Sequence, residues 1–329
     1  VGVLDGTIEN VKCDDKVFVT CGTSKQYNGG MVGTATNGII RNCWFDGNVN
    51  ATAAGLIAKN YVGYGMNKNA NQLYIADCEN TGDIYGDCHT GGIAGNITAQ
   101  ILDVKNCEVH DCKIVDLSAG DKGGIIGFDS ADQTFIMNCN VDNVEMERTS
   151  EHTGSTYGTT GGIIGNFCKW SGGVDTNIES VKVIDCKVTN SDITARSNSV
   201  GGIIGGGYGC YEQTNIEVYD SVVDECNILN KEIVSNTYSG AAGILGKAIY
   251  GGAIKIDNCL VNNSNIESRK HETKTGAYDQ DVGGILGMSW DGSGLEITNC
   301  DVLDCEILSR ATESDSCANI GGLVGGVGC

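Results

Sequence analysis

Apolar and polar residues alternate in short runs that recur along the whole chain. The last full run is LEITNCDVLDCEILS, from Leu295 to Ser309, and the earlier repeats have runs that align with it on the cysteine or on a serine in its place. Mostly branched aliphatic residues stand three residues before this position and again two and seven residues after it. Strict alternation of this kind is typical of a β-strand with one buried face.

The alternation slips twice in each run, once at the Asn-Cys or Asp-Cys step and once about five residues later. A slip of one residue turns the side chains to the opposite face of a strand, so it marks a corner or a bulge. Three short strands with two corners, followed by a loop, are the pattern expected of one coil of a parallel β-solenoid.

A glycine-rich word, Gly-Gly-aliphatic-aliphatic-Gly, separates these runs. Its copies begin at Gly29, Gly91, Gly123, Gly161, Gly201, Gly283 and Gly321, with degenerate copies at Ala54 and Ala242. The second residues of successive copies are 25 to 41 positions apart, a period typical of repeat architectures. We expect each word to form a strand in which one of the two central aliphatic residues faces outward. The glycines would let a neighbouring backbone approach closely or would supply a positive φ.

Composition agrees with this architecture. The 329 residues include 49 glycines and no proline, and the lack of proline suits a chain in which nearly every backbone N–H serves a sheet. A chain of this length can hold two or three domains, but a repeat from end to end favours one elongated unit. We therefore predict a single all-β domain over residues 1–329, a parallel β-solenoid of about eight or nine coils with variable loops and an incomplete coil at each end.

The segment GGMVGTATNGIIRNCWFDGNV, from Gly29 to Val49, resembles the GLUG repeat. Such repeats occur in bacterial cell-surface and secreted proteins, including adhesin-like chains and non-catalytic parts of some immunoglobulin A peptidases. The resemblance covers nearly the whole chain, which departs from the repeat in its many cysteines and in its few Gly-Asn-Val endings. It implies a right-handed solenoid that serves as an extracellular scaffold or adhesive stalk, and it transfers no catalytic residue.

Charge narrows the choice of partners. The 42 acidic and 21 basic residues give a formal net charge of −21, which disfavours binding to nucleic acid or to an anionic membrane through repulsion. The acidic residues form either a solvated surface or sites for a divalent cation, for which Ca²⁺ is the candidate. No apolar run is long enough for a membrane span and no signal peptide opens the sequence, so a secreted protein would be represented here by a mature or excised piece.

Most of the 17 cysteines stand in columns. Those of the main column are Cys43, Cys78, Cys107, Cys139, Cys186, Cys259 and Cys300, with Ser221 in the remaining place. A second column, five residues later, alternates Cys112, Ser191, Cys226, Ser264 and Cys305. Interchange with serine indicates a small buried residue at a tight corner rather than a disulfide. Zinc binding is not favoured, because no histidine column accompanies the cysteines.

Cysteines outside the columns are the candidates for disulfides. Cys168 and Cys210 follow two successive glycine-rich words. The pair Cys13 with Cys21 would cross-link the first coil, and the pair Cys317 with Cys329 would cross-link the last. Such bonds would place the protein in an oxidising compartment.

The residue before each main-column position is Asn or Asp. Stacked side chains of this kind can bond the backbone of their own turn and that of a neighbour, so we expect a structural ladder. Asn50, Asn96 and Asn262 stand in glycosylation sequons, which matter only in a source that glycosylates secreted chains.

No enzymatic constellation stands out from the repeats. The four histidines, His89, His110, His152 and His271, occupy unrelated repeat positions and are expected on the solvated surface. A P-loop is not favoured because Gly246-Lys247 lacks the following Ser or Thr. We therefore expect no catalysis. The alternative from another class is a carbohydrate-binding or carbohydrate-active β-helix with a groove of convergent acids.

The two ends of the sequence complement each other. The chain closes on GGLVGGVGC, the first part of a coil, and opens on VGVLDGTIENV, which matches the remainder of one. The chain is then either a piece of a longer surface protein or a subunit that stacks head to tail. We predict an extracellular or cell-surface structural or adhesive scaffold. Its loops at residues 60–72, 150–160 and 269–281 would offer a surface to a glycan or a host protein.

Overall fold

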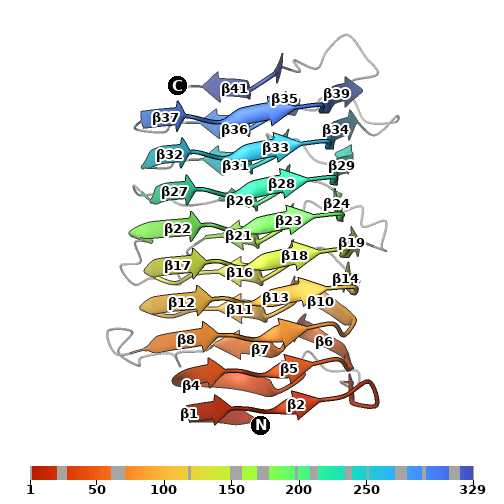
Figure 1. Ribbon diagram of the computed structural model, residues 1–329, viewed down its shortest axis with the longest axis vertical. Helices are drawn as coiled ribbons and strands as arrows, with labels where there is room; N and C mark the ends of the chain where they lie inside the picture. The colour runs from red at the N-terminus through yellow and green to blue at the C-terminus, as the bar shows by residue number, and fades with distance from the viewer. Residues whose placement is uncertain are drawn as a thin grey trace.

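The computed structural model describes residues 2–20, 28–60, 71–117, 120–148, 158–168, 178–196, 199–207, 214–233, 239–249, 252–270, 280–290, 294–310 and 319–328. These residues form an all-β structure without a helix, in which every pair of neighbouring strands runs parallel. The strands lie in layers stacked along the long axis, with the first and last layers at opposite ends (Figure 1).

The largest sheet contains two ladders that meet in the long strand β4. The ladder ahead of the main-column residues consists of β1 (Val3–Glu9), β4 (Val32–Arg41), β8 (Gln72–Ala76), β12 (Ile101–Lys105), β17 (Gln133–Met137), β22 (Ser180–Ile184), β27 (Asn215–Tyr219), β32 (Ala253–Asp257) and β37 (Gly294–Thr298). The other ladder consists of β7 (Ile57–Asn60), β11 (Ala94–Ile97), β16 (Ile126–Asp129), β21 (Ile164–Phe167), β26 (Ile204–Gly207), β31 (Leu245–Ile249), β36 (Leu286–Trp290) and β41 (Val324–Gly328).

The other two sheets follow the same layers. The short strands after the main-column residues are β2 (Lys12–Cys13), β5 (Trp44–Phe45), β9 (Glu79–Asn80), β13 (Glu108–His110), β18 (Asn140–Asp142), β23 (Lys187–Thr189), β28 (Val222–Asp224), β33 (Leu260–Asn262) and β38 (Asp301–Leu303). The third sheet begins with the ladder β3 (Phe18–Thr20), β6 (Asn48–Ala54), β10 (Ile84–Gly91), β14 (Lys113–Asp116), β19 (Glu145–Arg148), β24 (Asp192–Ala195), β29 (Asn227–Ile233), β34 (Asn265–Lys270) and β39 (Glu306–Arg310). It continues through β10 into β15 (Asp121–Gly123), β20 (Thr159–Gly161), β25 (Ser199–Gly201), β30 (Ser239–Ala242), β35 (Gln280–Gly283) and β40 (Ile320–Gly321).

Both predicted corners are present, and each is made by a residue in the left-handed region. At the first corner the residue before the main-column position has a positive φ, as in Asn106 at 53° and Asp185 at 52°. At the second corner Asn143 at 52° and Asn190 at 51° do the same, four residues after the main-column position. Asn and Asp tolerate this conformation better than other residues with a Cβ. The residue types therefore explain why the strand turns at these two places.

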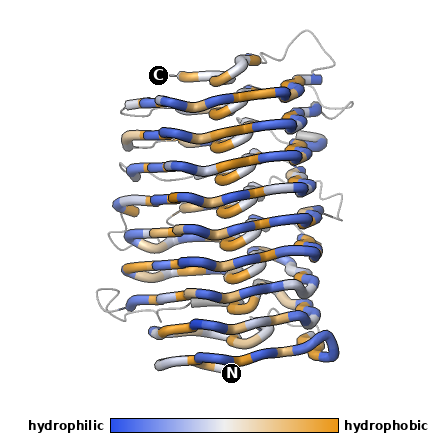
Figure 2. Tube along the Cα trace, viewed as in Figure 1, coloured by the Kyte–Doolittle hydropathy of each residue, from blue (hydrophilic) through white to orange (hydrophobic). Residues whose placement is uncertain are grey.

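The core consists of the apolar columns read from the sequence. Val183, for example, lies between Ile136 and Val218 of the adjacent layers, and all three side chains are fully buried. Figure 2 shows apolar residues recurring at equivalent places in successive layers. Stacking identical columns buries apolar surface continuously along the molecule, which is the main favourable term in its stability.

The glycine-rich word is a bend between two strands, so the prediction of a single strand is wrong. In one copy β25 ends at Gly201 and β26 begins at Ile204. Ile203 and Ile204 are both fully buried, and the expected outward-facing residue does not occur. Glycine is needed here because a Cβ on Gly201 would lie 1.9 Å from the carbonyl oxygen of Ile204. Close backbone approach, and not a positive φ, explains the glycine.

Candidate functional site

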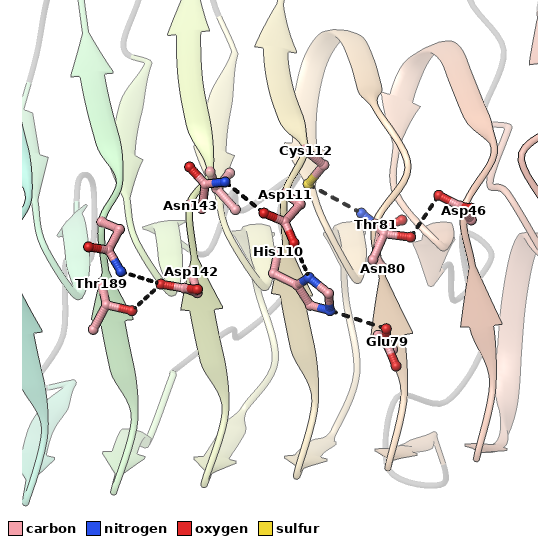
Figure 3. A network of polar contacts seen from close by, with 12 residues as sticks. Asp46, Glu79, Asn80, Thr81, His110, Asp111, Cys112, Asp142, Asn143 and Thr189 are labelled. Atoms are coloured by element: carbon pink, nitrogen blue, oxygen red, sulfur yellow. Dashed lines mark hydrogen bonds and ion pairs between the residues drawn. The ribbon is translucent and has the colours of Figure 1, made fainter.

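Side chains at the corners bond to one another from layer to layer. Asn106 donates its amide to Oδ1 of Asp77 at 2.9 Å, and Asn138 donates in turn to Asn106 at 2.9 Å. At the second corner Asn143 donates to Asp111 at 2.6 Å (Figure 3). The predicted ladder of Asn and Asp is therefore present. Its rungs are direct hydrogen bonds between side chains of adjacent layers. The same residues also form the backbone turns that the sequence indicates.

His110 belongs to the same network (Figure 3). Its Nδ1 lies 2.9 Å from Asp111 and its Nε2 lies 3.1 Å from Glu79. Burial lowers the pKa of His110, but hydrogen bonds to Asp111 and Glu79 outweigh it and the pKa is raised. The side chain is 29% exposed, so His110 lies at the surface but is partly covered. Both ring nitrogens are engaged between layers, which gives this histidine a structural role.

A second polar cluster contains side chains that are able to take part in chemistry. His89 and Asp121 are neighbours in the register of β10 and β15. Nδ1 of His89 lies 3.1 Å from Oδ2 of Asp121, without the alignment of a straight hydrogen bond. Cys88 precedes His89 on β10 and contributes to the raised pKa of its imidazole. We call Cys88, His89 and Asp121 the Cys88 cluster.

The environment of His89 keeps its imidazole protonated. The side chain is 20% exposed, and its ring packs on Phe128 with 4.5 Å between the centroids. Burial alone would lower the pKa of His89, but the contacts with Asp121 and Cys88 raise it to about 10. The raised pKa favours the protonated form of His89 beside Asp121 at neutral pH. The predicted solvated position of His89 is wrong, and His152 and His271 lie outside the described residues.

The surrounding backbone holds the Cys88 cluster in place. The N–H of Thr159, one layer further along, donates to Oδ1 of Asp121 at 2.9 Å. A Cβ on Gly120 would lie 1.0 Å from the carbonyl oxygen of Cys88, so only glycine fits there. Cys88 itself is half-buried. The thiol is thus positioned by rigid elements and remains partly accessible.

A buried ion pair lies on the opposite face of β15, the strand that bears Asp121. Nζ of Lys122 is 4.0 Å from Oδ2 of Asp116, and their side chains are 2% and 0% exposed. Asp116 also accepts a hydrogen bond from the N–H of Gly120 at 2.7 Å. Buried charges of opposite sign must be paired to be tolerated. We assign this pair a structural role, because it is closed to solvent.

Sequence reasoning misses the Cys88 cluster. Cys88 stands in neither cysteine column, and Asp121 lies 32 positions further along the chain (121 − 89) from His89. The only local signal is the Cys-His dipeptide, which is short and unspecific. The link to Asp121 depends on strand register, which the sequence does not reveal across a loop.

The column cysteines pack as predicted. Cys107, Cys139 and Cys186 are fully buried, as is Ser221. The Cys186 thiol donates to the carbonyl oxygen of Ile184 at 3.4 Å, and the Ser221 hydroxyl makes the equivalent bond to Tyr219 at 2.8 Å. Cysteine and serine interchange because both are small and both donate to the same carbonyl position. Burial raises the pKa of the Cys226 thiol in the second column to about 12.

The disulfide candidates remain predictions. Cys21, Cys210, Cys317 and Cys329 lie outside the described residues, so each predicted pair has a member there. No disulfide joins two cysteines within the described ranges. The proposed binding loops likewise lie largely outside these ranges, at residues 61–70, 150–157 and 271–279.

The sequon asparagines occupy strands. Asn50 on β6 is exposed, whereas Asn96 on β11 and Asn262 on β33 are half-buried. The side-chain amide of Asn262 donates to Oδ1 of Asp224 at 2.9 Å. A glycan at Asn262 would have to displace this bond, so Asn50 is the best placed of the three.

A shallow hollow of about 480 Å³ crosses β27, β32 and β37. Its lining includes Tyr219, Glu217, Lys255 and Glu296. The Tyr219 hydroxyl donates to Glu217 at 2.8 Å, and Lys255 lies 3.5 Å from Glu296. This hollow combines an aromatic ring with acids and a base on an outward sheet face.

Neither a metal centre nor a membrane helix is evident in the described part of the chain. No group of three or more His, Cys, Asp or Glu side chains there is arranged to hold a metal ion. No helix among those residues is long and apolar enough to cross a membrane. Comparisons of the chain with protein-family models, with curated proteins and with solved structures found no match.

Proposed function

We propose that the chain is a right-handed parallel β-solenoid of about eight or nine coils that acts as an extracellular structural or adhesive scaffold. The observation that carries this proposal is the recurrence of equivalent strands in successive layers, in which each repeat adds one rung to the same parallel ladders. Such a stack is stiff, because its layers are joined by backbone hydrogen bonds and by the corner side chains. The resemblance to GLUG repeats and the net charge of −21 support a place outside the cell and away from nucleic acid.

The end layers are open to a further layer, from a second copy or from neighbouring repeats of a longer chain. Ile320 and Leu323 are 54% and 47% exposed, although the equivalent residues one layer below are fully buried. At the other end Val11 is 40% exposed, in the place where the next layer has the buried Cys43. Strand edges and apolar columns exposed in this way are suited to pairing with another chain.

A second copy is one occupant that fits, and a neighbouring repeat of a longer chain is the other. When the register is continued across the two ends, Ile8 falls on Ile297 and Val19 falls on Ile307, so apolar columns meet apolar columns. Lys12 would face Asp301 in the same arrangement, which adds an attraction between opposite charges. Asn10 would continue the corner ladder, since it already accepts a bond from Asn42 in its own chain.

A matched pair of glycine variants tests this assembly. Gly322 is the second glycine of the last word, and a Cβ added to it would meet no atom within 4 Å, whereas a Cβ on the equivalent Gly284 would clash with Gly322 at 2.2 Å. Gly322→Ala should therefore fold normally and block the approach of a further layer. Gly294→Ala, on an outward sheet face with equally open surroundings, serves as the control that folds and assembles.

The measurement is negative-stain electron microscopy of the purified chain and both variants. We expect fibres for the wild-type chain and for Gly294→Ala, and separate short rods for Gly322→Ala. Short rods in all three samples would contradict end-to-end assembly and leave the scaffold as part of a longer chain. Fibres of Gly322→Ala would contradict the proposed register. Image reconstruction of the fibres would also test the right-handed coil.

The hollow around Tyr219 favours a second candidate function, carbohydrate binding. Aromatic rings flanked by acids and bases can stack on a sugar ring and bond its hydroxyls. Titration with a panel of soluble oligosaccharides, followed by tryptophan and tyrosine fluorescence, tests this candidate. We expect any binding to be lost in Tyr219→Ala and kept in Tyr74→Ala, which removes another exposed ring from the same ladder. Binding unaffected by Tyr219→Ala would exclude the hollow as the site.

A further inference from the structure

Lys122 and Asp116 place an amine and a carboxyl group inside the core. Their side chains are 2% and 0% exposed. Two layers further along the ladders, the equivalent positions hold Val200 and Ala195, which are also buried. Apolar side chains therefore suffice for packing at this place. Because exchanging a buried ion pair for apolar residues is often neutral or stabilising, the stability of the fold does not explain why this layer has a lysine and an acid.

The two groups are held near each other by strands. Asp116 is the last residue of β14, and Lys122 is the second residue of β15. Nζ of Lys122 lies 4.0 Å from Oδ2 of Asp116, which is longer than the roughly 2.7–2.9 Å of a charge-assisted hydrogen bond. Two reactive groups fixed side by side have an effective concentration of about 10⁵ M or more when their orientation is right. The strands thus favour a reaction between this amine and this carboxyl group.

Neighbouring groups can stabilise both the reaction and its product. The backbone N–H of Gly120 donates to Oδ2 of Asp116 at 2.7 Å. A fixed donor of this kind stabilises the negative charge that develops on the oxygen when the carboxyl carbon is attacked. In the adjacent layer Thr90 is in register with Lys122, and its buried Oγ1 has no hydrogen-bond partner among the described residues. This hydroxyl oxygen is available to accept the N–H of an amide formed at Lys122.

We propose that Lys122 and Asp116 condense to form an intramolecular amide, a covalent cross-link that joins the end of β14 to β15 within one layer. This modification goes beyond the scaffold function. The cross-link would also remove both charges from the core, where an ionised group is costly unless it is paired.

The reaction is a condensation that releases water. One proton first passes from Nζ of Lys122 to Oδ1 of Asp116, which gives a neutral amine and a neutral carboxyl group. The amine nitrogen then attacks Cγ, the Nζ–Cγ bond forms and the Cγ–Oδ1 bond breaks. Oδ1 leaves as water with the proton of the carboxyl group and one proton of the amine, and Oδ2 becomes the amide oxygen. No atom is oxidised or reduced, so no co-reactant is needed.

The test is mass spectrometry of the purified full chain after reduction and alkylation of its cysteines. We expect an intact mass lower than the sequence mass by one water molecule. Trypsin should fail to cleave after Lys122 and should release residues 114–148 as one dehydrated peptide, with no backbone fragment ions between Asp116 and Lys122. Lys113 is the internal control, because its ion pair with Glu145 is exposed to solvent and trypsin should cleave after it. A full sequence mass with normal cleavage after Lys122 would overturn the proposal.

Two variants identify the partners of the cross-link. Lys122→Met removes the amine and Asp116→Ala removes the carboxyl group, and each variant should have its full sequence mass. In Asp116→Ala trypsin should again cleave after Lys122. These measurements are made on the denatured chain, so they can be interpreted even if a variant is less stable. A loss of water that persists in Lys122→Met would place the dehydration at another site and would likewise reject the proposed amide.

Discussion

Gly162 lies directly against Val188, so closely that a Cβ on the glycine would stand 2.7 Å from a methyl carbon of the valine and 2.0 Å from the carbonyl oxygen of Gly202. The same contact recurs in the neighbouring layers, where Gly124 faces Val141 and Gly202 faces Val223. In these layers the second glycine of the word and the valine two residues after the main-column position are thus one structural unit. Their joint recurrence in the sequence has a single steric cause.

Gly162→Ala should destabilise the fold by at least about 2 kcal/mol, because the added methyl group overpacks a closed site and meets backbone that cannot move aside. Chemical denaturation followed by circular dichroism measures the change. Gly322→Ala, at the same place in the last word, should cost less than about 0.5 kcal/mol in the unassembled chain, since nothing lies within 4 Å of the new atom. Equal losses in the two variants would show that intrinsic backbone propensity, and not contact with the next layer, dominates.

Asn106→Ala should cost about 2–3 kcal/mol. The change places alanine, which has a Cβ but no polar side chain, at φ 53°. It also removes two side-chain hydrogen bonds of 2.9 Å, one donated to Asp77 and one accepted from Asn138. Asn106→Gly separates the two terms, because glycine adopts positive φ freely and lacks only the bonds. Thermal unfolding of both variants should rank the glycine variant between the wild-type chain and the alanine variant. A glycine variant as unstable as the alanine one would assign the whole effect to the ladder.

Local patterns were sufficient to predict the corners and columns, because each depends on residue type at one position of a repeat. Asn106 and Asp185, for example, mark turns by their own conformational preference. The bend of the glycine-rich word could not be predicted in this way, since two adjacent buried residues, Ile203 and Ile204, violate the alternation of a strand. The pairing of His89 with Asp121 could not be predicted from local patterns either. It depends on the register of strands separated by a loop, on which local alternation has no bearing.

Cys186→Ser should change stability by less than about 1 kcal/mol, because the hydroxyl can donate to the carbonyl of Ile184 as the thiol does. Ser221 makes the equivalent bond in the next layer. Cys186→Ala is the matched comparison, and it should cost about 1–2 kcal/mol more, since it loses the donor and leaves space in a fully buried position. The measurement is urea unfolding under reducing conditions. A serine variant as unstable as the alanine variant would mean that sulfur packing, and not donation to the carbonyl, matters here.

Asp129→Asn should stabilise the protein at pH 7.5 and have little effect at pH 4. Burial raises the pKa of the fully buried Asp129 from 3.8 to about 6, although hydrogen bonds from Thr134 at 2.6 Å and from the N–H of Ala131 at 3.0 Å work in the opposite direction. Because the folded state holds this proton more tightly than the unfolded chain does, the stability that it contributes is present below about pH 4 and is lost as the pH rises to about 6.

Asparagine keeps an acceptor for Ala131 and a polar contact with Thr134 but never ionises, so the variant should avoid that loss. The expected gain at pH 7.5 is about 1–3 kcal/mol, with a difference near zero at pH 4. Urea unfolding of both proteins at half-unit steps between pH 4 and pH 8 measures the difference. Asp129→Glu is the control that retains the charge, and it should show no gain at high pH. A stability difference between the wild-type chain and Asp129→Asn that does not vary with pH would contradict the assignment, because a pure packing effect does not follow the titration of the carboxyl group.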